Sequence, residues 1–335
     1  MVDKLSEKGF VMKRLTNLAV VGSFPSFDSD IETSILRVID LQLKYGIDVI
    51  SPGEQRYDMI AYFSEVLPGL KHEGNKSYIT GKIKSPVELS TFSKFRDIEL
   101  VKNYLEQRGE TNKKIKITVT GPITLGFTCA TSSNPHGKGN LGPYSGIIDL
   151  DLYADVSTAL KPIAEELQKR DVLVQIDEPG FGAGYINYRK FGKEIIQWIN
   201  EYLTPELKSE NTVMHVCGRL TKGLFEDILV KFENIENLSF AFDGSIEKDN
   251  IDIISRKVLE DHGKKLGVGC ISGANAVLSD PKTVKANIAA AVEKIGLDNI
   301  KFIHPDCGLK VISPEKAEMV LKNMVEGAQL FEETM

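Results

Sequence analysis

The chain has 335 residues, of which 42% are apolar and 26% charged, and its 47 acidic and 41 basic residues give a net charge of −6. This composition is that of a globular protein and excludes a disordered chain, a collagen-like repeat and a disulfide scaffold. The acidic balance, without any block of Lys or Arg, argues against nucleic acid as a partner. No apolar run approaches the roughly 18–20 residues that cross a bilayer, so we expect no membrane partner and a cytoplasmic protein.

The first residues, MVDKLSEKGFVMKRL, contain no apolar segment of the kind that a signal peptide carries. We predict a flexible N-terminal tail over residues 1–14, and the sequence is compatible with a start at either Met1 or Met12. The remaining residues, 15–335, are predicted to form one catalytic domain. In a cytosolic chain, the four cysteines are expected to be thiols or metal ligands rather than disulfides.

Short apolar runs recur along the chain, and the stretches between them are long enough for a helix. We predict eight strands, at Leu18–Phe24, Asp48–Pro52, Ile115–Thr120, Val172–Ile176, Val213–Val216, Leu238–Phe242, Leu266–Ile271 and Ile300–Ile303. Segments such as 31–46, 150–170 and 281–296 carry apolar residues at the three- and four-residue spacing of a helix. Strands that alternate with helices form parallel sheets, so eight such units predict a single (β/α)8 TIM barrel of the α/β class.

Two stretches interrupt this alternation. Residues 67–91 are expected to hold a small hairpin or an irregular excursion. Residues 129–148, CATSSNPHGKGNLGPYSGII, are rich in Gly, Ser, Asn and Pro and follow the third predicted strand. A long loop at that point would lie over the barrel mouth, either as a functional lid or as a flexible connection.

Polar residues collect where the predicted strands end, and barrel active sites lie at that face. The sharpest group is His215, Cys217 and Cys307. Residues two apart on a strand point to the same side, so His215 and Cys217 would face one point, which Cys307 can approach once the barrel closes. An imidazole and two thiolates are good zinc ligands, and three protein ligands leave an open position. The alternative is that these cysteines are small buried apolar residues, as we predict for Cys129 and Cys270.

Acidic residues follow two further strands. Glu54, Asp177 and Glu178 are candidates for holding the ammonium group of a substrate, although the carboxylates of QIDEP are equally suited to cap a helix or to form ion pairs. Ser23, in GSFP, is placed to donate to a substrate carboxylate, but a serine beside Gly and Pro usually marks only a turn. The segment GFGAG at 180–184 lacks the G-x-G-x-x-G spacing of a nucleotide-binding loop.

In chain order, the segments GSFP, PGEQRYDMIAYF, TGPITL, QIDEP, HVCG and HPDCGLK resemble those of the cobalamin-independent methionine synthase family. The resemblance spans roughly residues 20–310 and covers only the C-terminal catalytic barrel of that family, as in its short, single-barrel members from archaea and some bacteria. It implies an enzyme that moves a methyl group to the thiol of L-homocysteine and thereby forms methionine.

The resemblance also implies Zn2+ as cofactor. The family's zinc ligands match His215, Cys217 and Cys307, and its fourth ligand, a Glu, falls on Ala241 or Asp243, of which we assign Asp243. The residues that hold the amino-acid part of homocysteine match Ser23, Glu54 and Asp177. The chemistry agrees, because a free thiol has a pKa of about 8.5 and zinc deprotonates a thiol that coordinates it.

Two departures from the family concern the methyl donor. Ser272 stands where the family has a histidine that protonates the leaving folate nitrogen, and Thr128, beside Phe127, stands where a tryptophan stacks on the pterin. Because cobalt(I) leaves without a proton, we predict a methylated corrinoid as donor, either methylcobalamin or a corrinoid protein partner. Residues expected on the donor side or behind the metal ligands are Asp58, Thr128, Glu178, Ser272 and Asp306.

Other functions are left open by the sequence. The donor of the same reaction is alternatively methyltetrahydrofolate. Alkyl transfer to another thiol, such as coenzyme M, would use the same zinc pattern, but a sulfonate thiol has no ammonium for Glu54 and Asp177 to hold. A decarboxylase related to porphyrin-processing barrels would need no zinc. A zinc-binding or methyl-carrier accessory protein would keep its function without the Cys307 thiol.

Overall fold

A computed structural model describes residues 17–134 and 141–335, so the tail predicted at 1–14 and part of the loop predicted at 129–148 lie outside the described residues. Eight parallel strands form one sheet in the order β1–β10–β9–β8–β7–β6–β5–β2. Parallel bridges from Ala19 to Val49 and from Ser23 to Gly53 join the two outer strands and close the sheet. The prediction of a (β/α)8 barrel is therefore confirmed.

Each barrel strand overlaps one predicted strand. The bounds are β1 (Asn17–Leu18), β2 (Val49–Ile50), β5 (Lys114–Thr120), β6 (Leu173–Asp177), β7 (Thr212–Val216), β8 (Asn237–Ala241), β9 (Lys265–Ile271) and β10 (Ile300–Pro305). Strands β6, β7 and β8 are buried along their whole length, as expected for a parallel sheet covered on both faces. Strands β1 and β2 are shorter than predicted, because beyond them the chain pairs only through the two isolated bridges.

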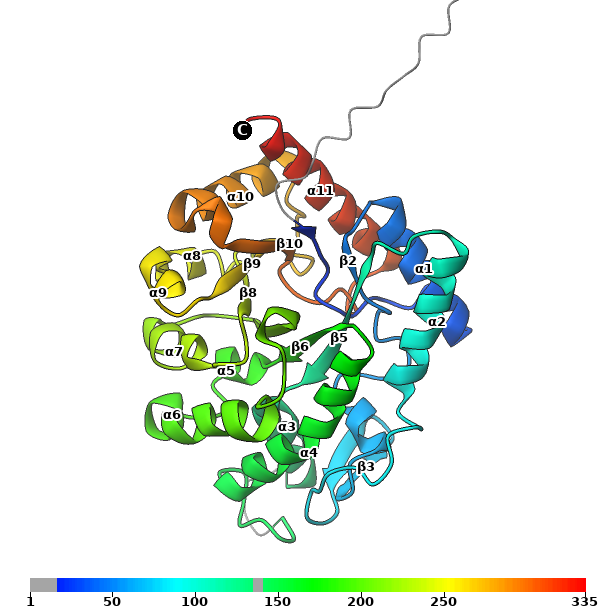
Figure 1. Ribbon diagram of the computed structural model, residues 1–335, viewed down its shortest axis with the longest axis vertical. Coiled ribbons are helices and arrows are strands. Elements are labelled where there is room, and N and C mark those ends of the chain that lie inside the picture. Colours follow the sequence, from blue (N-terminus) through cyan, green and yellow to red (C-terminus); the bar gives the residue numbers. More distant parts are fainter. Residues whose placement is uncertain (1–16, 135–140) are drawn as a thin grey trace, which may run out of the picture.

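Helices surround the sheet in Figure 1. Their bounds are α1 (Ile31–Lys44), α2 (Ser93–Gln107), α3 (Pro122–Ser133), α4 (Leu150–Lys169), α5 (Pro179–Ala183), α6 (Tyr188–Gln197), α7 (Lys222–Asp227), α8 (Asn250–Ile253), α9 (Arg256–Asp261), α10 (Pro281–Ile295) and α11 (Pro314–Glu332). Helices α1, α4 and α10 begin where an aspartate, Asp30, Asp149 or Asp280, accepts a backbone N–H of the first turn. None of the helices in the described part of the chain combines the length and apolar content needed to cross a membrane.

The two interruptions differ in how they match the sequence. The hairpin predicted within 67–91 is confirmed, because β3 (Leu70–Glu73) and β4 (Lys76–Ile79) pair antiparallel. The loop predicted at 129–148 begins later than expected, since residues 129–133 continue α3. Its described flanks are attached to the hairpin region and to α4: Ser133 accepts from the N–H of Ile79, and the Tyr144 hydroxyl lies between the Ile83 N–H and Asp155. A position over the barrel mouth stays a prediction.

The barrel interior is polar at its centre and apolar near the amino ends of the strands. Alternate residues of a strand face opposite sides of the sheet, so the buried polar residues of the strands gather inside the barrel. Those at inward-facing positions include Lys116, Thr118, Gln175, Asp177, His215, Ser239 and His304. An apolar layer of five residues, near the amino ends of their strands, consists of Ala19, Val49, Leu173, Val213 and Phe302. This layer covers the polar groups on the side of the amino ends, and the polar groups extend from there to the carboxyl ends of the strands.

Candidate metal and substrate site

Three side chains converge at the carboxyl ends of β7 and β10. Nε2 of His215 lies 2.8 Å from Sγ of Cys217, which in turn lies 3.1 Å from Sγ of Cys307. The three ligand atoms all lie within 4.8 Å of one another. An imidazole and two sulfurs are a donor set that suits zinc, and bonds of about 2.3 Å to sulfur and about 2.0 Å to nitrogen separate tetrahedral ligands by roughly 3.5–3.8 Å, so the spacings of 2.8 and 3.1 Å would have to widen slightly around the ion. The structure thus brings together the three ligands predicted from the sequence.

The local backbone explains this convergence. His215 is the fourth residue of β7 and Cys217 follows its last residue, so both side chains point to the same side. A β-carbon on Gly182 would lie 2.2 Å from the carbonyl oxygen of Cys217, so only glycine allows α5 to pack this closely behind the cluster. His215 is buried whereas Cys307 is exposed, so the cluster opens toward the solvent at its sulfur side.

The pKa values of the two thiols are shifted in opposite directions. The pKa of the Cys307 thiol is lowered, first because Cys217 hydrogen-bonds to it and then because His215 is close. The same contact with Cys307, together with burial, raises the pKa of Cys217. One sulfur of the pair is therefore disposed to be a thiolate, which is the form that binds a divalent cation. The other cysteines, Cys129 and Cys270, are confirmed as core residues.

The candidate ligands face a pocket of about 280 Å³. Its lining also includes the three residues predicted to hold homocysteine, which are Ser23, Glu54 and Asp177. Ser23 packs against the turn that carries Cys307, because a β-carbon on Gly308 would lie 2.2 Å from Ser23 Oγ. Apolar side chains close the wall between these polar groups, namely Val21, Met59, Pro179 and Val311.

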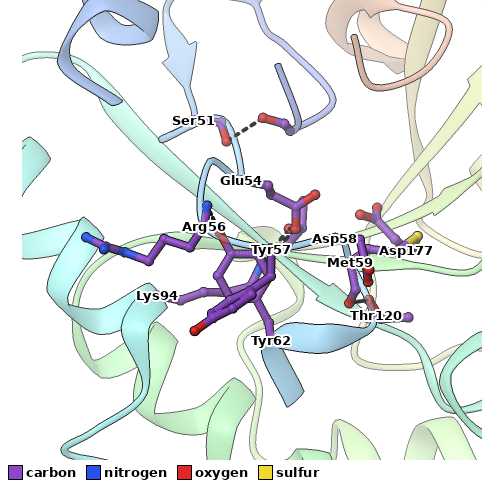
Figure 2. A network of polar contacts seen from close by, with 12 residues as sticks. Ser51, Glu54, Arg56, Tyr57, Asp58, Met59, Tyr62, Lys94, Thr120 and Asp177 are labelled. Atoms are coloured by element: carbon purple, nitrogen blue, oxygen red, sulfur yellow. Dashed lines mark hydrogen bonds and ion pairs between the residues drawn. The ribbon is translucent and has the colours of Figure 1, made fainter. Parts of the chain in front are cut away.

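Two lysines contact Glu54, one at its carboxylate and one at its backbone carbonyl. Its Oε1 lies 2.7 Å from Lys94 Nζ and 2.6 Å from Thr118 Oγ1, while Lys310 donates to its backbone carbonyl at 2.6 Å. Burial alone would raise the pKa of Glu54, but the ion pair with Lys94 holds that pKa below its ordinary value. Figure 2 shows Glu54, Lys94 and Tyr62 together, and the ammonium lies 4.2 Å from the Tyr62 ring centre. The sequence gives no signal for Lys94, since a lysine at a helix start is usually exposed.

Glu54 also has a backbone φ of +51°, which is uncommon for a residue other than glycine. The contact from Lys310 to the carbonyl oxygen of Glu54, and a second one to that of Tyr57, hold this turn in place. Such a conformation costs on the order of 1–3 kcal/mol and persists where the surroundings fix it, often at functional sites. The turn aims the Glu54 side chain into the pocket.

Asp177 is held through a chain of buried polar groups. Its Oδ1 accepts from Gln175 Nε2 at 2.7 Å, and the Gln175 oxygen accepts from Lys116 in the barrel interior. Burial raises the pKa of Asp177 to about 6. Gln175 belongs to the QIDEP segment, but its role in orienting Asp177 depends on the neighbouring strand and is not evident from the sequence.

The expected fourth zinc ligand, Asp243, lies outside the cluster. Its carboxylate accepts from the Ser272 N–H at 2.8 Å, from Ser279 Oγ at 2.8 Å and from Asn287 Nδ2 at 2.9 Å. Among the residues that the structure describes, the metal-binding group contains only His215, Cys217 and Cys307. The structure therefore does not bring Asp243 to the other three side chains, because the loop after β8 turns its carboxylate toward donors of the β9–α10 segment.

Three residues predicted near the donor or behind the ligands accept hydrogen bonds from backbone N–H groups, and their predicted roles stay predictions. Asp58 accepts from the two amides of Ile60 and Ala61. Glu178 accepts from the amides of Ile123 and Thr124 at the start of α3. Asp306 binds the amides of residues 242–244 and thereby ties the turn after β8 to the residue that precedes Cys307.

The two positions that depart from the resembled family are also placed. Ser272 is buried and gives its N–H to Asp243. Thr128 is half-buried on α3, and its neighbour Phe127 stacks on Tyr185 with ring centres 4.1 Å apart. The aromatic pair lies between α3 and the segment after α5. The sequence alone predicted only that Phe127 is next to the position at which the family has its stacking tryptophan.

The fold and the site are those of a (β/α)8-barrel protein in which an imidazole and two thiols lie close together beside two carboxylates. Residues 16–330 match the family described as "Cobalamin-independent synthase, Catalytic domain". The chain belongs to this family, which confirms the resemblance and the prediction of an enzyme.

Individual relatives agree with this membership. "Methionine synthase" of Methanothermobacter marburgensis is 28% identical over 312 residues, which cover 93% of this chain and 92% of the relative. The "5-methyltetrahydropteroyltriglutamate–homocysteine methyltransferase" of Bacillus licheniformis is 26% identical over 90% of this chain but only 38% of its own length. A B12-independent methionine synthase structure from a Shewanella species has a TM-score of 0.71 at 19% identity and covers 96% of this chain and 99% of that one, which supports the fold.

The comparisons correct one prediction. A methylated corrinoid donor is at odds with a family described as cobalamin-independent. The alternative donor, methyltetrahydrofolate, agrees better with the name of the Bacillus relative. Loss of a histidine and a tryptophan at two positions was therefore too little to infer a change of donor.

Proposed function

We propose that this chain transfers a methyl group to the sulfur of L-homocysteine and forms methionine. The observation that carries the proposal is that one pocket contains the His215–Cys217–Cys307 cluster and the side chains of Ser23, Glu54 and Asp177. A cluster suited to activating a thiol and groups suited to an amino acid thus share one cavity. The printed names of the archaeal and bacterial relatives support this acceptor.

His215, Cys217 and Cys307 would hold Zn2+ as the cofactor. When bound there, zinc would supply the coordination that keeps an acceptor thiol ionised near neutral pH, where a free thiol with a pKa of about 8.5 is mostly protonated. The donor set supports this choice, because two sulfurs and one imidazole suit zinc far better than magnesium or calcium. Three protein ligands also leave a position for the acceptor sulfur.

The other pocket residues would bind and orient the acceptor. Glu54 and Asp177 would pair with its ammonium group, and Ser23 would donate to its carboxylate. The apolar wall of the pocket would reduce the access of water to the acceptor sulfur. Holding the amino-acid end at these three points would fix the direction of the thiolate toward the methyl group.

The donor that we propose is an N-methylated tetrahydropteroyl compound. In the reaction, the S–CH3 bond forms as the N–CH3 bond breaks, and the leaving amine takes up the proton that the acceptor thiol releases. The family description and the name of the Bacillus relative support this donor.

The test combines metal content with an activity matrix. Wild-type protein is expected to bind about one zinc per chain, and Cys217→Ser to lose most of it, whereas Cys129→Ala, a buried cysteine outside the cluster, should keep it. Zinc-loaded protein is then assayed with homocysteine or coenzyme M and with methyltetrahydrofolate, its triglutamate form or methylcobalamin. Turnover that needs methylcobalamin would overturn the donor, and wild-type turnover by Cys307→Ala would overturn the role of the cluster.

A further inference from the structure

A buried chain of hydrogen bonds begins at the candidate ligand His215 and ends at a backbone carbonyl. His215 Nδ1 lies 2.9 Å from Ser239 Oγ, Ser239 Oγ lies 2.9 Å from His304 Nε2, and His304 Nδ1 lies 2.7 Å from the Pro305 oxygen. The three side chains are 1%, 2% and 1% exposed, respectively. Since buried polar groups must find partners inside the protein, each proton along this chain has a defined place.

The Pro305 carbonyl sets the direction of the chain. A carbonyl oxygen only accepts, so Nδ1 of His304 carries a proton. A neutral imidazole carries one ring proton, and burial favours the neutral form, so with the proton on Nδ1 the Nε2 of this buried ring is an acceptor. The single hydroxyl proton of Ser239 is therefore donated to His304 Nε2.

The consequence reaches the cluster. Because Ser239 Oγ has given its proton to His304, it offers only lone pairs to His215, and His215 Nδ1 must be the donor in that hydrogen bond. Nε2 of His215, which lies 2.8 Å from Cys217 Sγ, is then the nitrogen whose lone pair can accept from that thiol or bind a metal ion. We propose that Ser239 and His304 are positioning residues that lock His215 in the Nδ1–H tautomer and so reserve Nε2 for the metal ion.

The proposal rests on the zinc site of the proposed function and adds two residues that contact neither metal nor substrate. Metal-bound histidines commonly donate their other N–H to a fixed acceptor, and loss of that acceptor typically weakens metal binding 10–100-fold. Here the acceptor is itself fixed by a second imidazole. Gly267 of β9 makes room for the pair, because a β-carbon there would lie 2.7 Å from His304 Nε2 and 3.3 Å from Ser239 Cβ.

Zinc affinity, measured by competition with a chromophoric chelator, tests the lock without any assay of turnover. Ser239→Ala removes the acceptor, and we expect a 10–100-fold weaker affinity. His304→Phe leaves Ser239 in place but frees its proton to point at His215 Nδ1, so we expect a loss of about tenfold or more. His304→Gln keeps an oxygen acceptor and should bind zinc nearly as the wild type does.

The matched control is Ser157→Ala, which removes a buried serine hydroxyl that bonds only to a helix carbonyl. It should leave the zinc affinity unchanged. Zinc affinity of His304→Phe equal to that of the wild type would overturn the proposal, since a role of Ser239 alone does not depend on His304.

Nitrogen-15 NMR of histidine-labelled protein reads the tautomer directly in the wild type, and the chain has only five histidines. We expect the His215 ring, assigned by its loss in His215→Asn, to carry its proton on Nδ1. A proton on Nε2 with Nδ1 free would overturn the lock. A wild type that binds no zinc but shows the Nδ1–H tautomer would overturn the proposed function and leave the lock standing, so the two failures are distinguishable.

Discussion

Glu54 owes its charge in the pocket largely to one neighbour. Its side chain is 10% exposed and that of Lys94 is 5% exposed, and the two charged groups lie 2.7 Å apart. Burial disfavours an isolated carboxylate, so the ammonium is what keeps Glu54 ionised and available to a substrate. Removing one partner of a buried pair leaves the other charge unpaired, which typically costs about 3–5 kcal/mol.

Lys94→Met is therefore expected to lower the free energy of unfolding by about 3–5 kcal/mol near pH 7, measured by urea denaturation. The wild-type pKa of Glu54 is depressed, so its contribution is present above the unfolded pKa of about 4.3 and is lost as the pH falls through the folded pKa. In the variant, burial raises the pKa of Glu54, and the folded state binds a proton more readily than the unfolded chain. The deficit should therefore shrink as the pH falls toward 4.

The matched control for this prediction is the double variant Glu54→Gln/Lys94→Met, which removes the unpaired charge as well. It should recover much of the lost free energy of unfolding. Its remaining deficit relative to the wild type should depend little on pH between 4 and 7. A deficit in Lys94→Met that is equal across that range would contradict the ion-pair explanation and would indicate lost packing against Tyr62.

At the scale of elements, Asp243 connects the turn after β8 to the β9–α10 segment. Its carboxylate accepts from a backbone amide, a serine hydroxyl and an asparagine amide of residues 272–287. We expect Asp243→Ala to lower the free energy of unfolding by about 1–3 kcal/mol, because three partly buried donors lose their partner. The zinc content of the variant, measured on folded protein, should equal that of the wild type.

This outcome separates two roles for one residue. Loss of zinc from Asp243→Ala with the fold intact would restore Asp243 as a ligand and would contradict the geometry described above. Asn287→Ala is the companion variant, because it removes a donor to Asp243 without changing any carboxylate. It should destabilise the same segment and also retain zinc.

The elements themselves were predictable because each strand is a short apolar run that ends in a polar turn. The partner that a side chain at the end of a strand contacts was less predictable. Asp243 was expected to reach the metal from its sequence position, but donors 29–44 residues further along turn it away. Residues 129–133 look like loop by composition, yet they continue α3, because Ser and Thr are tolerated at the end of a helix that packs against a neighbour.

At the scale of the whole molecule, closure of the barrel brings together Cys217 and Cys307, which lie 90 residues apart. The sequence predicted this meeting because the carboxyl ends of parallel strands share one face. It did not predict the buried chain through Ser239 and His304, since a serine within an apolar strand gives no sign of its partner on another strand. Lys94 was missed for the same reason, because its partner belongs to a different element.

The cluster joins strands that are not neighbours, because β8 and β9 lie between β7 and β10 in the sheet. A zinc ion held by the folded state alone would stabilise the barrel by about 2.7 kcal/mol at a free concentration 100 times its dissociation constant. With roughly 2–4 °C per kcal/mol for a large domain, calorimetry should show the melting temperature rising by about 5–10 °C. The chelator-treated protein should melt at the lower value, and Cys217→Ser should show little response. An equal rise in Cys217→Ser would mean that zinc stabilises the protein from another place.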